Sequence, residues 1–232
     1  MSPRPKTASD DVILDAAARQ LDRLGPARMR LEDVAREVGL APATLLLRFK
    51  SKRGLLLAVA ERGIAEMADY FRARRARAAS PLDAITDACD CIGAMAEAPQ
   101  QLANLLAFHQ LSLEDPEFRA VAKRHDAALA AEMARLLEEA RAAGQLADCD
   151  TGALARAVIA MTRGSLLTWT ALGRHDNHAA WVKADLEILL HPFRRAGLPR
   201  QAGQRRDASA AGAAPAPAPT RLAARRSRAA RS

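Results

Sequence analysis

Three observations predict that the chain folds as an all-α protein. Alanine and leucine dominate a composition that is 50% hydrophobic but only 3% aromatic. No stretch alternates apolar and polar residues or gathers β-branched residues as a strand would. Apolar residues instead recur at three- and four-residue spacing, which is typical of amphipathic helices. A chain of 232 residues suits one or two domains with an ample core.

The first expected helix runs from a cap at Ser9 to about Leu24. Two acidic residues follow the cap, where negative charge favours the helix dipole. Gly25-Pro26 is expected to stop the helix, and residues 1–8 are expected to be disordered. Its buried face is supplied by Ile13, Leu14, Ala17, Leu21 and Leu24.

Residues 31–52 contain two short helical patterns joined by a turn. The first pattern places apolar residues on one face, at Leu31, Val34, Ala35 and Val38. Gly39 then ends it, as a left-handed C-terminal residue would. Pro42 begins a second helix that reaches about Phe49, because a proline costs nothing in a first helical turn. Two helices with such a turn form a helix-turn-helix, whose second helix can enter the DNA major groove.

The helices on both sides of this unit complete a pattern that belongs to a known family. The segment ILDAAARQLDRLGPARMRLEDVAREVGLAPATLLLRFKSKRGLLLAVAER resembles the DNA-binding domain of TetR-family transcriptional regulators. It contains that family's A-x-x-x-G-L/V…T-L…F-x-S-K-x-x-L-L skeleton. The resemblance implies a three-helix DNA-binding domain over residues 9–54, an effector-binding and dimerisation domain over residues 55–197, and about nine helices in all.

The remaining helices are expected from their caps and apolar spacing. A long helix begins near Ser51 and continues to the arginine-rich stretch RARRARAAS, and in the family this helix bridges the two domains. The later starts are marked by a capping box at Ser80-Pro81-Leu82-Asp83, by Pro99, by Asp115-Pro116, by Asp150, and by Asp176 or Asn177. The corresponding helices are expected to end near Glu97, before Asp115, at Gly144, near Leu172 and near Phe193.

The last two helices carry more apolar surface than a monomer of this size easily covers. Similar regulators pair these helices with those of a second copy in a four-helix bundle, so we expect a homodimer. The expected interface residues are Leu166, Trp169, Leu186, Leu189, Leu190 and Phe193. The alternative is that both apolar stripes are consumed inside one subunit.

The net charge of +8 resides mainly in the C-terminal tail. Residues 198–232 contain eight arginines and one aspartate, which leaves +1 for the rest of the chain. Their Ala/Pro/Arg-rich composition cannot bury a core and predicts disorder. The tail either adds DNA affinity that does not depend on sequence or has no function. The high isoelectric point is therefore not proof that the folded part binds nucleic acid.

The resemblance also implies which residues contact double-stranded DNA. These are Arg30, Pro42, Ala43, Thr44, Leu47, Arg48, Lys50 and Lys52. Leu45 and Phe49 are expected to pack inward. Thr44 can reach a phosphate or a base edge, and Lys52 lies where similar proteins hold a phosphate. Arg48 is either a DNA contact or a solvated surface arginine.

Four positions depart from the family pattern. Leu46 replaces the usual Tyr, Leu47 stands where a polar or aromatic residue is common, and Ala41 and Arg30 replace the usual Ser and Thr caps. Leu46 cannot donate a hydrogen bond to a phosphate, and a lost cap costs ~1 kcal/mol. Either the chain recognises an unusual operator, with Leu47 against a thymine methyl group, or its DNA binding is weak and relies on other groups.

A small apolar or amphipathic effector is expected to bind in the larger domain. Mostly apolar side chains with a few polar ones suit such a cavity. The expected pocket residues are Met67, Phe71, Leu105, Phe108, His109, Met133, Met161 and Ser165. The alternative for each of them is a place in the ordinary core.

No motif indicates an enzyme, so we expect no catalytic residue, metal site or cofactor. The five histidines lack metal-ligand spacing, and neither a phosphate-binding glycine loop nor G-x-S-x-G is present. Cys89 and Cys91 are either buried inert thiols or redox sensors. The cysteine content fits a reduced compartment, and neither a membrane span nor a signal peptide is evident. We expect a cytoplasmic protein.

The resemblance thus implies a TetR-like DNA-binding regulator, and most members of that family are repressors. Binding of the effector would change the spacing of the two recognition helices on a palindromic operator. The alternative is a ligand-binding or scaffolding protein of the same fold with degenerate DNA binding, as Leu46 and Leu47 would allow.

Overall fold

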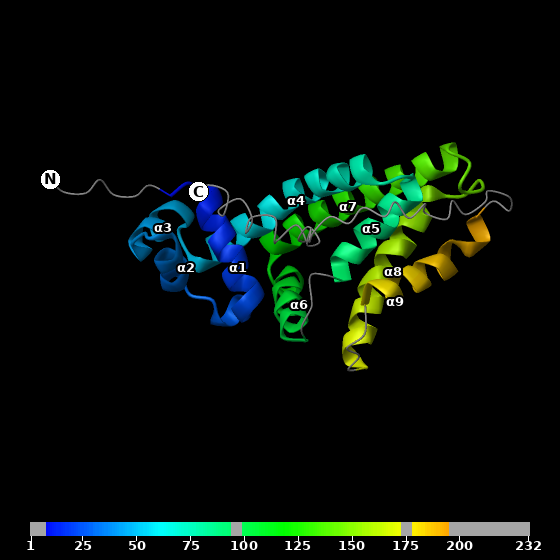
Figure 1. The fold of residues 1–232 in the computed structure, drawn as a ribbon. Helices are drawn as coiled ribbons and strands as arrows, with labels where there is room; N and C mark the ends of the chain where they lie inside the picture. Colours follow the sequence, from blue (N-terminus) through cyan, green and yellow to red (C-terminus); the bar gives the residue numbers. More distant parts are fainter. Residues whose placement is uncertain (1–7, 94–98, 173–177, 195–232) are drawn as a thin grey trace, which may run out of the picture.

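The computed structural model describes residues 8–93, 99–172 and 178–194, in which every regular element is a helix (Figure 1). The all-α prediction is confirmed. In chain order the helices are α1 (Asp10–Arg28), α2 (Leu31–Val38), α3 (Pro42–Phe49), α4 (Lys52–Arg77), α5 (Pro81–Gly93), α6 (Pro99–Glu114), α7 (Pro116–Ala142), α8 (Thr151–Ala171), α9 (His178–Leu190) and the short 3-10 helix η1 (His191–Phe193).

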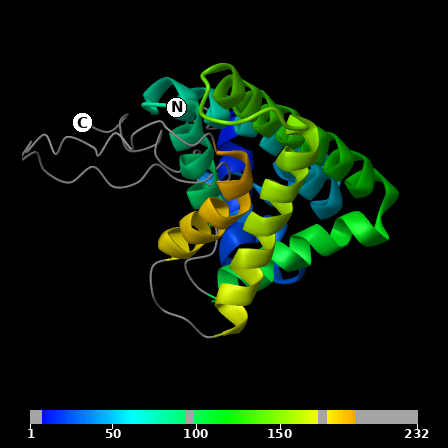
Figure 2. The same ribbon diagram turned by 90° about the vertical axis from the view of Figure 1, so that its right-hand side faces the viewer.

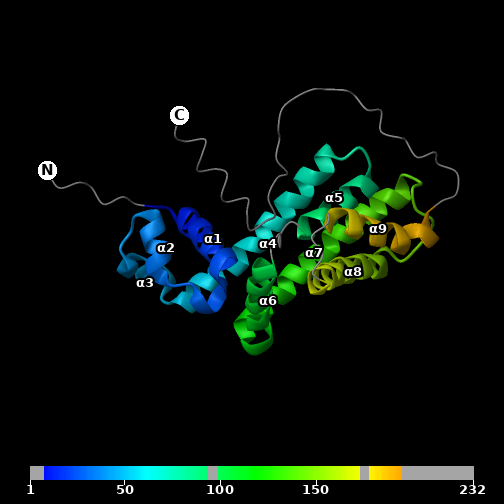
Figure 3. The same ribbon diagram turned by 60° about the horizontal axis from the view of Figure 1, so that its bottom comes forward.

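The helices form two units that α4 connects. Helices α1 to α3 form a small unit at one end, and α4 leads away from it alongside α7 (Figure 1). Helices α5, α8 and α9 complete the larger unit, and α8 and α9 lie side by side along one flank (Figures 2 and 3). Helix α6 packs against both α1 and α7, so it lies between the two units.

Each unit has its own hydrophobic core, and α4 contributes to both. The N-terminal core includes Ile13, Leu14, Ala17, Leu21, Val34, Leu45, Leu55, Leu56, Val59 and Phe118. The C-terminal core includes Met67, Phe71, Ile85, Met133, Leu136, Leu137, Val158, Leu186 and Leu190. Because α4 belongs to both cores, the domain boundary predicted between residues 54 and 55 stays a prediction.

The end of α1 differs from the prediction. The backbone breaks at Gly25, whose φ of 74° and ψ of 168° are not helical, but Pro26 then begins a further helical turn that ends at Arg28. Proline fits the first turn after a break because its missing N–H has no helical partner to lose. The regular part of α1 therefore stops at Gly25-Pro26 as predicted, and the difference is the additional turn that reaches Arg28.

The predicted caps are present where the structure describes them. The Ser80 hydroxyl accepts a hydrogen bond from the Asp83 N–H at 3.2 Å and donates one to the Asp83 carboxylate at 2.8 Å. Ser9, Asp115 and Asp150 cap α1, α7 and α8 through their side chains. The predicted end at Glu97, the cap at Asp176 or Asn177, and the tail after Arg194 lie outside the described residues.

Candidate nucleic-acid interface

The turn between α2 and α3 has the predicted helix-turn-helix geometry. Gly39 takes a left-handed conformation, with φ 70° and ψ 31°, and its N–H bonds back to the end of α2. The Leu40 N–H also donates to the Ala35 carbonyl, at 2.9 Å. Pro42 then occupies the first turn of α3. Together these contacts fix the direction in which α3 leaves the turn.

The caps missing from the sequence are also missing from the structure. Neither Arg30 at the start of α2 nor Ala41 at the start of α3 forms a side-chain cap hydrogen bond. Packing therefore holds α3 in place. Leu45 is fully buried in the N-terminal core, and Phe49 packs against that core half-buried. Both residues point inward as predicted.

The opposite face of α3 is open to solvent and largely apolar. Leu47 is 74% exposed and Leu46 is 46% exposed. Pro42 and Ala43 are also exposed, whereas Thr44 is half-buried. Helix α3 lies at the end of the molecule farthest from α8 and α9 (Figure 1). Its apolar face is therefore free of contacts from the larger unit.

Three of the four cations predicted to contact DNA, Arg48, Lys50 and Lys52, hydrogen-bond to backbone carbonyls of the chain. Arg48 Nη1 donates to the Ala8 carbonyl at 2.6 Å and to Asp10 Oδ1 at 3.0 Å. Lys50 Nζ donates to the Leu47 carbonyl and Lys52 Nζ to the Ala27 carbonyl, each at 3.0 Å. Arg48 is therefore not a freely solvated arginine, because it joins the end of α3 to the start of α1.

The turn between α3 and α4 is strained and tightly packed. Lys50 adopts a φ of 68°, which is unfavourable for a residue with a Cβ atom. The Ser51 N–H bonds to the Phe49 carbonyl at 2.8 Å across it, and the Ser51 hydroxyl caps α4 by accepting from the Gly54 N–H. A Cβ at Gly54 would lie 2.0 Å from the Phe49 carbonyl oxygen. Glycine at 54 thus permits the turn that places Lys50 and Lys52.

Hydrogen bonds connect the larger unit to the small N-terminal unit at the start of α4. Arg53 donates to both carboxylate oxygens of Asp115, at 2.7 and 2.8 Å, and to Glu117 at 2.8 Å. Its guanidinium also lies 5.8 Å from the ring centroid of Phe118. The Arg53 guanidinium holds the pKa of Asp115 at about 2 through their hydrogen bonds.

A second link joins α1 to α6. Asn104 of α6 is buried, and its Nδ2 donates to the Asp22 carbonyl of α1 at 2.7 Å. The amide lies against Gly25, where a Cβ would come within 2.7 Å of Asn104 Oδ1. Sequence reasoning missed Arg53 and Asn104 because their partners are 62 and 82 residues away. No local pattern indicates pairs so distant.

The residues predicted to line an effector pocket lie in several places. Met67, Phe71 and Met133 are buried in the C-terminal core, and Met161 packs against it. Phe108 packs on the N-terminal core, while Leu105 contacts a pair formed by Leu102 and Leu166. The Ser165 hydroxyl bonds to Asp185, and His109 is exposed on α6. The structure thus gathers four of the eight predicted residues.

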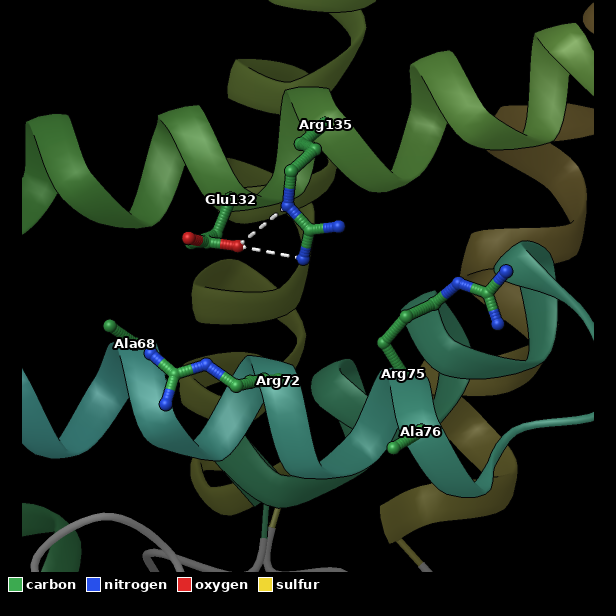
Figure 4. A pocket seen from close by; sticks show the side chains of 6 residues that line it. All are labelled: Ala68, Arg72, Arg75, Ala76, Glu132 and Arg135. Carbon is green, nitrogen blue, oxygen red and sulfur yellow. Dashed lines mark hydrogen bonds and ion pairs between the residues drawn. The ribbon is translucent and has the colours of Figure 1, made fainter.

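A surface groove lies elsewhere, between α4 and α7. It has a volume of about 380 Å³ and is lined by Ala68, Arg72, Arg75, Ala76, Glu132 and Arg135 (Figure 4). Glu132 accepts two hydrogen bonds from Arg135, and Arg75 pairs with Glu139. None of these residues was predicted to line a pocket. Arg72 pairs with Asp69, so each charged side chain that lines the groove has a partner within the protein, and the groove does not indicate a ligand.

The predicted dimer residues divide into covered and accessible ones. Leu166, Leu186 and Leu190 are buried within the single chain. Trp169, Leu189 and Phe193 are only half-buried. Three further apolar side chains on the same helices are exposed, at Leu167, Leu172 and Ile188.

The described residues contain neither a cluster of metal-binding side chains nor a membrane-spanning helix. Within residues 8–93, 99–172 and 178–194, His, Cys, Asp and Glu side chains form no cluster of three or more that could hold a metal ion. In the same ranges no helix is long and apolar enough to cross a membrane. Cys89 is fully buried, and this burial raises the pKa of its thiol to about 12. Cys89 is therefore a buried thiol with little thiolate character.

Comparison with known protein families agrees with the helix-turn-helix geometry of the N-terminal unit. Residues 13–59 match the family model described as bacterial regulatory proteins, tetR family. This match spans most of α1, all of α2 and α3, and the start of α4. The predicted resemblance to the TetR family is confirmed. No curated protein sequence matches the chain.

Solved structures of TetR regulators share the fold over most of their length. A TetR transcription regulator from Haloarcula marismortui is 16% identical, with a TM-score of 0.66 over 80% of this chain and 98% of that one. The fatty acid degradation regulator FadR from Bacillus halodurans is 20% identical, with a TM-score of 0.63 over 81% and 97%. SmeT, the repressor of the Stenotrophomonas maltophilia multidrug efflux pump SmeDEF, is 21% identical, with a TM-score of 0.60 over 84% and 94%.

Proposed function

We propose that this chain, which has the fold and the N-terminal domain of TetR-family transcriptional regulators, is a homodimeric repressor. It binds a palindromic operator through α3 and is released by a small apolar or amphipathic effector. The observation that supports this most directly is the exposed α3, held by a helix-turn-helix turn inside the segment that matches the family model. We propose a cytoplasmic location, because the operator DNA would be there.

Dimerisation is proposed through the outward faces of α8 and α9. Leu167, Leu172 and Ile188 are exposed there, beside the half-buried Trp169 and Phe193. A two-fold interface uses the same patch on both copies, so one apolar face suffices. We accordingly propose that Leu166, Leu186 and Leu190 support this face from inside the subunit.

The effector is proposed to enter the methionine-rich part of the C-terminal core. Met67, Met133 and Met161 come together there with Phe71. Methionine side chains are flexible and repack around ligands of different shape. The similarity to regulators of multidrug efflux and of fatty acid degradation favours an apolar or amphipathic compound.

Effector binding is proposed to reach α3 through the two links between the units. A shift of α6 would displace Asn104 from α1, and a shift of α7 would displace Asp115 from Arg53. Phe108 and Phe118, whose rings meet edge to face at 6.1 Å, connect α6 and α7 at the N-terminal core. Either movement would alter the spacing of the two copies of α3, which must match successive major grooves.

Selection of DNA from a random pool by the purified full-length protein tests the proposal. Enrichment of a two-fold symmetric site, with half-sites one helical turn apart or a multiple of it, is the expected result. A folded dimer that enriches no sequence even at low salt would support the alternative, a ligand-binding or scaffolding protein with degenerate DNA binding. An inducer identified afterwards should lose its effect with Met133→Ala and keep it with Leu113→Ala, an exposed position outside this core.

A further inference from the structure

The solvent-facing surface of α3 is an apolar patch in a position where DNA-reading helices usually present hydrogen-bonding groups. Ala43, Leu46 and Leu47 lie three and four residues apart, so their side chains are neighbours on one face. Leu47 is 74% exposed and Leu46 is 46% exposed. Leu47 is thus mostly open to water and Leu46 about half open, although such exposure of large apolar groups is unfavourable in water.

The apolar patch on α3 has few hydrogen-bond donors near it that are not already engaged within the protein. Thr44 and Arg48 are the polar side chains in α3, and Lys50 follows at its C-cap. Arg48 donates to the Ala8 carbonyl and the Asp10 carboxylate, at the start of α1. Lys50 folds back onto the Leu47 carbonyl. Only Thr44, which is half-buried, remains to hydrogen-bond a base edge without first breaking a contact within the protein.

An apolar face can recognise one group in the major groove. Guanine, cytosine and adenine are distinguished there by their hydrogen-bonding atoms, most often by arginine, lysine, asparagine, glutamine or an acidic side chain. Thymine also presents its C5-methyl group, which makes apolar contacts. A base edge without a methyl group would lose water at Leu47 and gain no hydrogen bond, which is unfavourable.

We propose that Leu47, with Ala43 and Leu46 beside it, recognises thymine through its methyl group, so that thymines specify each operator half-site opposite α3. This inference rests on the proposed function, because it names the chemistry by which that same helix distinguishes its site. It also accounts for the absence of the tyrosine usual at position 46. A leucine there enlarges the apolar contact at the expense of one phosphate hydrogen bond.

Replacing thymine by deoxyuridine in the selected operator tests this proposal, since uracil pairs identically and lacks only the methyl group. The full-length protein is titrated on operators that carry uracil at one position at a time, symmetrically in both half-sites. At one or two positions per half-site the affinity should fall about fourfold for each methyl group removed, as expected from ~0.8 kcal/mol for burial of one carbon group. Uracil at the other positions should have no effect.

Variants of the protein assign the methyl group to its leucine. Leu47→Ala should bind the thymine operator more weakly than wild type does. On the uracil operator the two proteins should bind equally, because uracil has already removed the methyl contact. Leu47→Gln should become insensitive to uracil and shift the preference towards adenine, to which glutamine bonds through two atoms. Leu113→Ala of α6, where the leucine is equally exposed at 74%, is the matched control and should behave as wild type on both DNAs.

Each outcome decides between the two proposals. Equal affinity for the thymine operator and all its uracil versions would overturn methyl recognition and leave operator binding intact. An equal loss of affinity of Leu47→Ala on the thymine and uracil operators would also overturn methyl recognition and leave operator binding intact. If selection yields no operator at all, the proposed function fails, and this inference fails with it.

Discussion

Arg53, in the first turn of α4, donates two hydrogen bonds to the carboxylate of Asp115, the residue that caps α7. The same carboxylate accepts from the Glu117 and Phe118 N–H groups of α7. A single side chain therefore caps the start of α7 in the larger unit and binds α4, the helix that leaves the N-terminal unit. Movement of α7 cannot leave Arg53 undisturbed.

The first prediction concerns the pH dependence of this pair. Asp115→Asn should lower the unfolding midpoint at pH 7, because asparagine can still cap α7 but cannot pair with Arg53. The pKa of Asp115 lies at about 2, below its ordinary value of 3.8, because Arg53 hydrogen-bonds the charged form. Since the folded-state pKa is the lower one, the stabilisation is complete above pH 3.8 and is lost as the pH falls through about 2.

Thermal unfolding of wild type and Asp115→Asn between pH 7 and pH 2 checks this prediction. The difference between their midpoints should be constant down to about pH 4 and shrink below it. Arg53→Ala should cost less in the Asp115→Asn background than in wild type, because the Arg53–Asp115 pair is already lost there and only the contacts of Arg53 with Glu117 and Phe118 remain. A difference that stayed the same at pH 2 would contradict the assigned pairing.

The second prediction concerns the contact between α1 and α6. Gly25→Ala should destabilise the protein strongly, since alanine is strained at φ 74° and ψ 168°, which costs about 1–3 kcal/mol, and its Cβ would also lie 2.7 Å from Asn104 Oδ1. Gly39→Ala should cost only about 1–2 kcal/mol, because φ is similarly positive at 70° but no atom lies within 4 Å.

Urea unfolding of both variants separates strain from collision. In an Asn104→Ala background the cost of Gly25→Ala should fall towards that of its backbone strain, whereas the cost of Gly39→Ala should be unchanged. Equal costs for Gly25→Ala in both backgrounds would show that α6 does not press on α1 at this position.

Much of the fold could be predicted because its determinants are local. The Ser80 capping box, Asp115 before Pro116, and left-handed Gly39 each depend on residues within three or four positions, which the sequence displays directly. Leu45 and Phe49 could be assigned to the inner face of α3 because helical periodicity and the family resemblance agreed.

Helical periodicity identifies a buried side chain but not the helix that covers it. Phe108 and Met133 were therefore assigned to one pocket, although they pack in different cores. For Arg48 the sequence leaves a DNA contact or a solvated arginine open, and it does not reveal that a carbonyl 40 residues earlier in the chain lies within reach of this side chain. The stop at Gly25-Pro26 was predicted, but the further turn to Arg28 was not, because a proline that stops one helix equally well starts the next.

The third prediction separates phosphate contacts from base contacts at α3 and α4. Lys52→Ala should weaken binding to the selected operator and to random DNA alike, and should reduce the salt slope by about 0.9 for each lysine in the dimer. Thr44→Ala should weaken binding to the operator by about 1 kcal/mol for each copy in the dimer, the net value of one hydrogen bond. It should leave random DNA unaffected if the hydroxyl bonds a base.

Fluorescence titrations of both DNAs at several salt concentrations measure both effects. Because Lys52 donates a hydrogen bond to the Ala27 carbonyl, the thermal unfolding midpoint of Lys52→Ala must also be compared with that of wild type. An unchanged salt slope in a folded Lys52→Ala protein would mean that this lysine does not reach a phosphate.

The fourth prediction concerns the arginine-rich segment 198–232, which lies outside the described residues. We propose that its eight arginines add affinity that does not depend on DNA sequence. Truncation after Gly197 should then flatten the dependence of log affinity on log salt by about 0.9 for each arginine engaged. Binding to specific and random DNA should weaken together, with their ratio nearly constant. Identical slopes for the truncated and full-length dimers would show that the segment does not touch DNA.

The ratio of affinities for the selected operator and for scrambled DNA of the same composition tests the central claim most directly. It is measured with the full-length dimer near physiological salt, because nonspecific binding depends steeply on ionic strength. A DNA-reading α3 predicts a ratio of about 10³ or more, reduced in Leu47→Ala and unchanged in Leu113→Ala. A ratio near one for the folded wild-type dimer would contradict the account.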